Sequence, residues 1–482
     1  MAISTAAAAP LTEDRVLLLY NSASADSRAV HDLYLAAHPG VLEFDLADPT
    51  LAPANRARLG DITRAEFESR IRAPLRSYLA GVDAAGRTRA QRVIAIATTR
   101  GLPARIIGAD EFTLHSTFSS LESELTLLQQ SLISTPAAPP FQTAVAGSID
   151  NPYHGRVGQP ITAFDRAGIQ SPESFGLARL AAWRAPDLTP GDMYLVCRLD
   201  SAPGPEPGVT ALDNIAALIT RSQTLTLDPA RAQAILDEWS PAFDQLDDDG
   251  GLFFSTADDF TAASEALSAA GVRTTHDETF AFIPAAATPD PQLPIVLLAT
   301  YGENHAAGGF GADPPGVGDY LALYPHIHPA GVFIAYESFN GNSLITGAQR
   351  GGQQQALDFI ARGGSFTVAH VAEPFSYSVA DTEMLVKNLL LGGMTFAEAA
   401  YSAIPTLSWQ STPIGDPLAR VHLTTAAPAP ADLTGDGVVD GADLATVLSV
   451  WGAVGSAIHG DVNGDGVVDG ADLALILTSW TG

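Results

Sequence analysis

Short apolar runs, separated by amphipathic segments, make up the pattern of the first 423 residues. Within these runs, polar and apolar positions do not alternate cleanly, which is typical of strands that are covered on both faces. We expect strands at Val16–Tyr20, Val93–Thr98, Tyr194–Leu199, Leu252–Ser255, Ile295–Thr300, Val332–Tyr336 and Phe366–His370.

The segments between these runs carry start and stop signals of helices. Threonines followed three positions later by glutamate predict capping boxes, an Asp-Pro pair predicts a helix start, and glycines predict helix ends. These signals are Thr63 with Glu66, Thr395 with Glu398, Asp228 with Pro229, and the glycines Gly271 and Gly363. The alternation of strands and helices predicts an α/β domain over residues 15–423, with a mainly parallel three-layer sheet. A sub-boundary is expected within residues 203–291.

The C-terminal part of the chain has a different pattern. Residues 424–431 (TTAAPAPA) are interpreted as an Ala/Pro linker. The segment DLTGDGVVDGAD then starts at Asp432, and its near copy DVNGDGVVDGAD starts at Asp461, 29 residues later. Each copy runs into an apolar helical pattern. The repeat therefore predicts a small all-α domain over residues 432–482.

Each 12-residue segment has oxygen-bearing side chains at positions 1, 3, 5, 9 and 12, a glycine at position 6 and a carbonyl at position 7, which is the ligand plan of an EF-hand loop. The sequence thus predicts two bound Ca²⁺ ions. The expected ligands are Asp432, Thr434, Asp436, Val438 (carbonyl), Asp440 and Asp443 in the first loop, and Asp461, Asn463, Asp465, Val467 (carbonyl), Asp469 and Asp472 in the second. This domain contains eight aspartates and no lysine or arginine, so calcium is expected to drive its folding. The alternative interpretation is an acidic disordered tail.

Composition narrows the classes of partner. The chain has 25 basic and 54 acidic residues, and its formal net charge of -29 argues against nucleic acid and anionic membranes as partners. No apolar run reaches the roughly 20 residues of a transmembrane helix. Cys197 is the only cysteine, which excludes intrachain disulfides. Residues 1–14 are expected to be a flexible N-terminus, whose alanines are compatible with the tail of a removed signal peptide.

Ligands of open parallel sheets bind beyond the carboxyl ends of the strands, so we expect the polar residues after the strands to share one rim. The candidates for ligand binding are Arg100, Arg198, Asp200, Glu303 and Glu373. The candidates for catalysis are Ser338 (or a water) as nucleophile, His305 or His370 as base, and Glu337. The alternative is that these arginines and carboxylates form structural ion pairs.

The tandem loops, with Asp and not Glu at position 12, resemble the type I dockerin family. The resemblance implies binding to a cohesin domain through loop positions 10 and 11 and the following helix. Those positions are Gly441, Ala442, Leu448 and Ser449 in the first repeat, and Gly470, Ala471, Leu477 and Thr478 in the second. Thr434 stands where the family has Asp or Asn, which predicts a weaker first site. The Gly-Ala pairs depart from the family's usual hydroxyl pair, which leaves open a divergent cohesin or another surface receptor.

The large domain carries VLLLYNSASADS at Val16, ITRAEFESRIRAPLR at Ile62, TTRGLPARI at Thr98 and LSWQSTPIGDPLARV at Leu407, and it is similar in these segments to an uncharacterised secreted bacterial family. More distantly, it resembles caspase-like peptidases of the gingipain type. The late motif Gly415-Asp416-Pro417 matches, Ser338-Phe339-Asn340-Gly341 stands where that family has Cys-x-x-Gly, and residues 301–305 stand where it has its histidine. Serine in place of cysteine implies an altered or lost peptidase activity.

Three functions follow from these observations, all for a secreted or cell-surface protein that docks through its C-terminus. The large domain is a hydrolase of peptidase-like chemistry, a non-catalytic binding or assembly domain, or a polysaccharide-degrading hydrolase. The last needs two carboxylates about 5–10 Å apart, for which Glu303, Glu337 and Glu373 are candidates.

Overall fold

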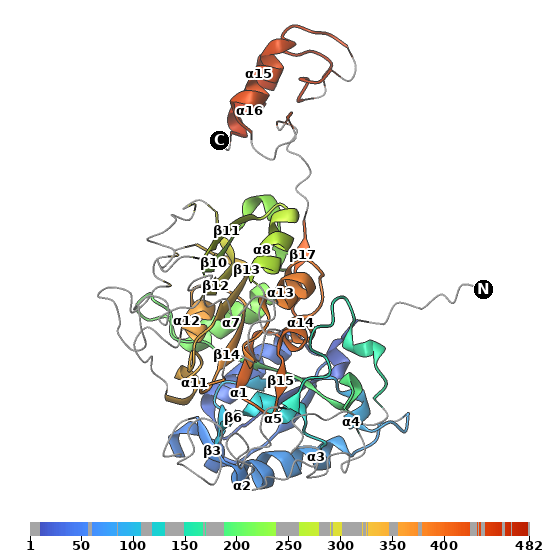
Figure 1. The fold of residues 1–482 in the computed structure, drawn as a ribbon, viewed down its shortest axis with the longest axis vertical. Coiled ribbons are helices and arrows are strands. Elements are labelled where there is room, and N and C mark those ends of the chain that lie inside the picture. Colours follow the sequence, from blue (N-terminus) through green and yellow to red (C-terminus); the bar gives the residue numbers. More distant parts are fainter. Residues whose placement is uncertain are drawn as a thin grey trace, which may run out of the picture. The chain divides into compact units, whose positions relative to one another are not determined.

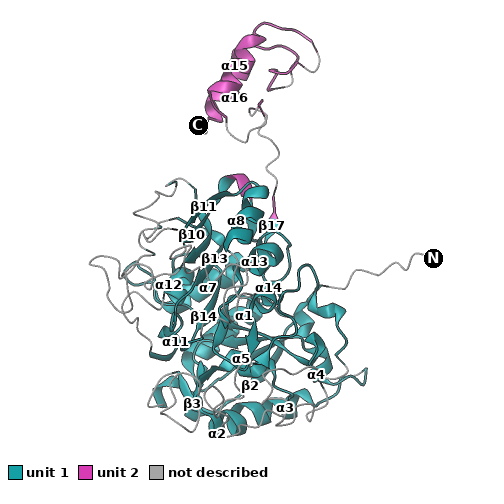
Figure 2. Ribbon diagram, viewed as in Figure 1, with its two compact units in different colours: residues 1–227, 231–422 teal, residues 228–230, 423–482 magenta. Residues whose placement is uncertain are grey.

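A computed structural model describes residues 10–55, 60–83, 85–107, 118–130, 149–166, 169, 188–237, 260–278, 290, 293–300, 321, 324, 326–346, 355–374, 378–424, 431, 433–434, 439–455, 458–463 and 465–480. The chain divides into two compact units (Figure 2). The first unit is residues 1–227 and 231–422, and the second is residues 228–230 and 423–482.

The first unit is built on a ten-stranded sheet with the order β11-β10-β12-β13-β14-β16-β8-β4-β1-β2 (Figure 1). The expected α/β fold with a mainly parallel sheet is therefore confirmed. The strands are β1 (Val16–Tyr20), β2 (Leu42–Asp45), β4 (Ala95–Thr99), β8 (Leu195–Leu199), β10 (Gln233–Asp237), β11 (Arg273–Asp277), β12 (Ile295–Thr300), β13 (Ile327–Ala335), β14 (Phe366–His370) and β16 (Ser411–Ile414).

The sheet contains two groups of parallel strands, β11-β10-β12-β13-β14 and β8-β4-β1-β2, with β16 between them. Neighbouring strands are parallel everywhere except between β14 and β16, which pair antiparallel with His370 opposite Ser411. The segments that follow the strands of these two groups nonetheless lie together: Arg105 Nη1 donates to the carbonyl of Val371 at 3.2 Å, and Ala104, Ile345 and Val371 form one apolar cluster. The expected shared rim agrees with these contacts, since one cavity is lined by Arg100 and Asp200, which follow β4 and β8, and by Ser343, which follows β13.

Strands β12, β13 and β14 are buried on both faces, which explains why they lack polar alternation. On β13, Val332 and Ile334 pack into one apolar cluster, and Phe333 and Ala335 pack into another. Helix α12 (Ala356–Ala361) contributes Phe359 to the second cluster, whereas α8 (Phe260–Ala269) and α14 (Phe396–Ala403) contribute to the first. A strand between two apolar layers needs apolar side chains at successive positions.

The other elements connect and extend this sheet. The helices are α1 (Ala25–Ala37), α2 (Arg64–Glu66), α3 (Ala73–Leu79), α4 (Arg89–Arg92), α5 (Leu121–Thr126), α7 (Ala211–Ser222), α11 (Ser343–Thr346) and α13 (Thr382–Leu385), with π-helical stretches at Phe67–Arg72 and Val386–Leu390. The small sheets are built from β3 (Asp61–Thr63), β5 (Arg105–Ile107) and β6 (Phe118–Ser120), from β7 (Ile149–Asp150) and β15 (Thr406–Leu407), and from β9 (Thr226–Leu227) and β17 (His422–Leu423). Short 3-10 turns lie at Glu13–Arg15, Pro49–Leu51, Pro53–Asn55, Ile161–Ala163, Pro190–Asp192 and Pro229–Arg231.

The local signals in the sequence are found where expected. The capping boxes at Thr63 and Thr395 are both present, and Gly271 and Gly363 have positive φ values of 92° and 104°. The Asp228-Pro229 pair opens only the short 3-10 turn Pro229–Arg231. Strands β2, β10, β11 and β16 were not predicted, and the expected strand Leu252–Ser255 lies outside the described residues.

The second unit contains two nine-residue helices, α15 (Gly441–Ser449) and α16 (Gly470–Thr478), each starting directly after an acidic loop. Its small core holds Val439 and Val447 from the first repeat and Val468 and Ile476 from the second. These pairs are separated by the same 29 residues as the two loops. The repeat in the sequence is thus also a repeat of buried positions and helix starts.

Candidate functional site

A serine and a glutamate meet at the carboxyl ends of the parallel strands β13 and β14. Ser338 lies three residues after β13, and Glu373 lies three residues after β14. The Ser338 Oγ hydroxyl donates a hydrogen bond to Oε2 of Glu373, and both residues are only partly buried. A hydroxyl and its carboxylate acceptor thus lie together within reach of solvent.

The turn that carries Ser338 has an uncommon backbone conformation. Phe339, the next residue, has a φ of 63°, in the left-handed region that bulky residues rarely adopt. Its amide donates to the carbonyl of Ala372 at 2.8 Å, and the amide of Gly341 donates to the carbonyl of His370 at 2.9 Å. These bonds tie the turn to the end of β14. Backbone strain that is held by surrounding contacts is common at functional sites.

The segment that carries Glu373 is anchored from three sides. The amide of Val371 donates to the carbonyl of Gln410 at 3.1 Å, and Arg105 Nη1 donates to the carbonyl of Val371 at 3.2 Å. On the other side of Glu373, the indole Nε1 of the buried Trp409 donates to the carbonyl of Pro374 at 2.8 Å. Because the backbone on both sides is held, the carboxylate of Glu373 has a defined position opposite Ser338.

The histidine at this edge lies deeper than the serine. His370 is fully buried, and its Nδ1 is 3.2 Å from the carbonyl oxygen of the equally buried Glu337, so Nδ1 is the protonated nitrogen of the ring. Burial lowers the pKa of His370 to about 4, which keeps the imidazole neutral. Among the described residues, no hydrogen bond joins His370 to Ser338, and Nε2 of His370 has no partner. The expected Ser–His contact is therefore absent there, while Glu303 and His305 lie outside the described residues.

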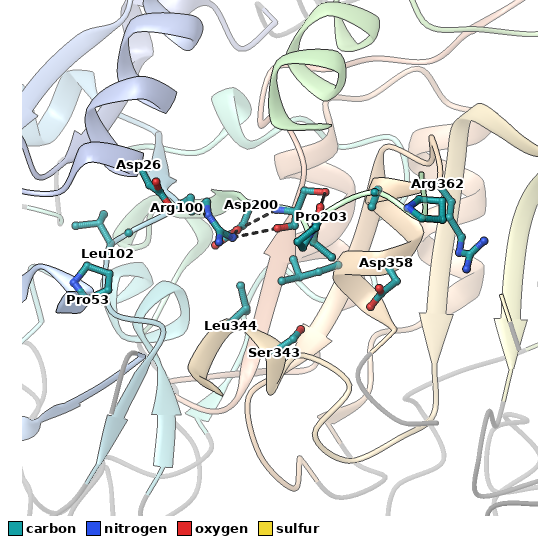
Figure 3. A pocket seen from close by; sticks show the side chains of 17 residues that line it. Asp26, Pro53, Arg100, Leu102, Asp200, Pro203, Ser343, Leu344, Asp358 and Arg362 are labelled. Carbon is teal, nitrogen blue, oxygen red and sulfur yellow. Dashed lines mark hydrogen bonds and ion pairs between the residues drawn. The ribbon is translucent and has the colours of Figure 1, made fainter. Parts of the chain in front are cut away.

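A cavity of about 560 Å³ lies between residues that follow β4 and β8 and residues that follow β13, and its volume is typical of sites for small ligands. On one side of it, Arg100 forms ion pairs with Asp26 at 2.9 Å and with Asp200 at 2.8 Å (Figure 3). Ser343 and Asp358 lie across from them. Arg100 and Asp200, two of the predicted ligand-binding residues, are thus brought together, but the arginine is already neutralised by two carboxylates.

Arg198, predicted to bind a ligand with them, has a structural role instead. Its side chain is 1% exposed, and its Nε donates to Glu122 Oε1 at 3.0 Å. The other guanidinium nitrogens contact the carbonyls of Leu102 and Pro103. Each nitrogen of this guanidinium is engaged inside the protein, and the buried side chain offers no surface to a ligand.

A second buried network was missed in the sequence. Asp416, noted only as part of a motif, accepts a hydrogen bond from the Tyr34 hydroxyl at 3.0 Å and lies 2.9 Å from Nε2 of His38. Nδ1 of His38 is 3.2 Å from Glu13. These partners are up to 382 positions apart in the chain, and no local spacing indicates such contacts.

In the second unit, backbone amides of the acidic loop that starts at Asp461 donate hydrogen bonds to carboxylates of the same loop. Asp461 Oδ2 accepts from the amide of Gly466 at 2.8 Å, and Gly466 has a φ of 86°, which a sharp turn at position 6 requires. Asp465 Oδ1 accepts from the amide of Val467 at 2.9 Å. The chain therefore brings positions 1, 5 and 6 of the loop close together.

The aspartate at position 12 closes each loop onto its helix. Asp472 accepts from the amides of Val462, Asn463 and Asp469 at 2.7, 3.1 and 2.8 Å. Burial acts to raise the pKa of Asp472, but these hydrogen bonds outweigh it and hold the pKa below its ordinary value, so the group is ionised. Asp443 takes the same role in the first loop, where it accepts from Thr434 and Asp440, both at 2.9 Å.

The remaining predicted calcium ligands are accounted for as follows. Asp432, Asp436 and Val438 lie outside the described residues. In the described part of the chain, no three His, Cys, Asp or Glu side chains are grouped closely enough to hold a metal. Several loop carboxylates accept backbone amides, yet a carboxylate has about four acceptor positions and keeps capacity for a cation. The donor set, with four aspartates and one asparagine side chain in 12 residues, is of the hard oxygen type that Ca²⁺ prefers.

The residues that the dockerin resemblance assigns to partner binding are all exposed, namely Gly441, Ala442, Leu448, Ser449, Gly470, Ala471, Leu477 and Thr478. Leu448 is 53% exposed and Leu477 is 55% exposed. Trp451 and Trp480, which follow the two helices, are also exposed. The unit thus presents the same apolar residue types twice.

Comparison of the chain with protein family models, with curated proteins and with solved structures finds no match. In the part of the chain that the structure describes, no helix is both long enough and apolar enough to cross a membrane.

Proposed function

We propose that residues 432–482 are a calcium-binding docking module of the dockerin type, which attaches the α/β domain to a cohesin-like partner outside the cell. The observation that carries this proposal is the equivalence of the two repeats. Both have the same loop pattern, the same helix start and the same exposed leucine, at Leu448 and Leu477. Large exposed apolar side chains on so small a unit favour an interaction surface.

Charge supports a role for calcium in this unit. Its eight aspartates give a side-chain charge of about -8 at neutral pH, and two Ca²⁺ ions would reduce this to about -4. In the second repeat the ligands are Asp461, Asn463, Asp465, Asp469 and the carbonyl of Val467, with Asp472 at position 12. Calcium would join these oxygens and so stabilise the turn at Gly466.

Calorimetric titration of the metal-free full-length protein with CaCl₂ tests the proposal. We expect two bound ions for the wild type and one for the variant Asp461→Asn/Asp465→Asn. The matched control, Glu206→Gln/Glu265→Gln, removes two exposed carboxylates outside the loops and should still bind two ions. No binding at millimolar calcium, or equal stoichiometry in all three proteins, would refute the calcium module. Capture by immobilised cohesin domains, lost on addition of EDTA, then identifies the partner.

We further propose that the α/β domain is a hydrolase related in plan to caspase-like peptidases, with Ser338 as nucleophile. The observation that favours this is the Ser338–Glu373 hydrogen bond beside the left-handed residue Phe339. The non-catalytic alternative uses the cavity at Arg100 and Asp200 as a binding site. Covalent labelling of Ser338 by an alkyl fluorophosphonate separates the two, because only an activated serine reacts with it.

A further inference from the structure

The partner of the Ser338 hydroxyl is a carboxylate, not an imidazole. A serine hydroxyl is a weak nucleophile until a neighbouring base removes its proton, and the base must lie within hydrogen-bond reach. Among the described residues, the group in that position is Glu373, which accepts the bond directly on Oε2. His370 donates through Nδ1 to the Glu337 carbonyl and has no described contact with the serine.

On this basis, and resting on the proposed hydrolase activity, we propose that Glu373 is the general base for Ser338 in a serine–carboxylate site that cleaves acyl substrates, either esters or amides.

Hydrolysis at this site needs no reactant other than the acyl substrate and water. Ser338 Oγ bonds to the substrate carbonyl carbon while its proton passes to Glu373 Oε2, and the carbonyl π pair moves to oxygen. Collapse breaks the bond to the leaving oxygen or nitrogen, which takes the proton from Glu373. Water then attacks the acyl-serine, giving one proton to Glu373, and the bond from the acyl carbon to Oγ breaks. The proton returns to Oγ, and a carboxylic acid is released.

Backbone contacts around Ser338 and Glu373 hold the two side chains in a fixed arrangement. Gly341 packs so closely on β14 that an added Cβ would lie 3.0 Å from Cβ of Ala369 and 3.1 Å from the carbonyl oxygen of His370. The backbone around Glu373 is held by Arg105 and Trp409, as described above. The serine and the glutamate are thus fixed on two segments that are themselves hydrogen-bonded to each other. General acid–base catalysis requires this kind of fixed geometry more than any particular residue type.

His370 is poorly placed to serve instead. It is fully buried, whereas Ser338 and Glu373 are partly exposed to the solvent from which a substrate arrives. The neutral ring, a consequence of the pKa of His370 being lowered by burial, also bonds to a backbone carbonyl and so supports the turn. We therefore assign His370 a positioning role.

The experiment measures the rate at which an alkyl fluorophosphonate labels the full-length protein, with the modified peptide located by mass spectrometry. In this reaction Oγ bonds to phosphorus, fluoride leaves, and the base takes the proton. We expect the wild type to be labelled at Ser338, and Ser338→Ala to be unlabelled there. Glu373→Gln keeps the side-chain size but removes the base. Its Ser338 should be labelled at least about 100-fold more slowly than that of the wild type, as expected for loss of a general base.

The controls separate a base from a residue that merely supports the fold. Glu66→Gln removes a carboxylate that also accepts a hydroxyl hydrogen bond, from Thr63 at 2.8 Å, and should label like the wild type. His305→Gln and His370→Gln should each slow labelling at least about tenfold less than Glu373→Gln does, because neither removes the base. Melting curves confirm folding of each variant. If Glu373→Gln does not fold, Glu373→Asp replaces it, because it keeps the carboxylate but withdraws it by one methylene and should label at least tenfold more slowly.

The outcomes are distinguishable. Two results would overturn the assignment of the base but leave the hydrolase proposal standing. In one, Ser338 is labelled at the same rate without the Glu373 carboxylate. In the other, either histidine variant slows labelling as much as Glu373→Gln does. Absence of any label at Ser338 in the wild type refutes the hydrolase proposal and this inference together.

Discussion

Replacement of Arg198 by methionine tests whether this residue belongs to the core or to a binding site. Arg198 and Glu122 are 1% and 0% exposed, and the guanidinium Nε lies 3.0 Å from Glu122 Oε1. In Arg198→Met the Glu122 carboxylate stays buried, and its remaining side-chain partners among the described residues are the hydroxyls of Thr98 at 2.7 Å and Thr412 at 3.4 Å. Breaking a buried pair by removing one partner costs about 3–5 kcal/mol.

Urea denaturation followed by tryptophan fluorescence measures this loss. With a urea m-value of about 3 kcal/mol per molar, the upper end for small proteins, the midpoint should fall by about 1–1.7 M. The double variant Arg198→Met/Glu122→Leu replaces both charges by apolar groups, so it should be more stable than the single variant by at least about 1 kcal/mol.

A surface ion pair provides the control. Arg273 contacts Asp290 at 2.7 Å, but its side chain is 58% exposed, so Arg273→Met should cost less than about 1 kcal/mol. The structural role of Arg198 would be refuted if the urea midpoint of Arg198→Met were not lower than that of Arg273→Met. It would also be refuted if Arg198→Met/Glu122→Leu were no more stable than Arg198→Met. Arg198 would then regain its place among the candidates for ligand binding.

Two further predictions concern pH and backbone strain. Burial acts to lower the pKa of His38, but its hydrogen bonds to Asp416 and Glu13 outweigh this and raise the pKa above its ordinary value. The stabilisation by protonated His38 is therefore complete below about pH 6.5, and it is lost as the pH rises through the raised pKa. Melting temperatures between pH 5.5 and 8.5 should fall more steeply for the wild type than for His38→Gln, and parallel curves would contradict this. The free energy of unfolding of Phe339→Val should be about 1 kcal/mol lower than that of Phe339→Gly, because valine tolerates a φ of 63° poorly and glycine adopts it readily. Equal midpoints in urea would show that the left-handed turn is not retained.

Signals that act over a few residues could be recognised without the structure. The strands Val16–Tyr20, Ile295–Thr300 and Phe366–His370 coincide with β1, β12 and β14, because strands between two apolar layers are continuous apolar runs. The capping boxes at Thr63 and Thr395 join groups three residues apart, so their spacing alone indicates them. The edge strand β11 was missed, since its residues are mostly polar and half-buried.

The candidate site could be predicted only in part. Ser338 was recognised because it follows an apolar strand, but its expected partner was a histidine. The structure pairs it with Glu373, 35 positions later, because β13 and β14 are neighbours and both segments leave the sheet at the same edge. The motif Glu373-Pro374, directly after a strand, was the available signal. No signal in the sequence indicated the conformation of Phe339, because phenylalanine rarely adopts a left-handed φ.

The sequence by itself determined the class of the fold, the individual strands and capped helices, and the tandem acidic loops with their 29-residue repeat. Each of these depends on periodicity or on side chains that contact a backbone a few residues away. Tertiary structure alone decided the order and direction of the strands. Strand β16 pairs antiparallel with β14 and meets β8 at the pair Ile414–Arg198, and so joins two groups of strands whose following segments line one cavity. Such pairing depends on backbone hydrogen bonds between segments far apart in the chain, which present the same groups whatever their side chains.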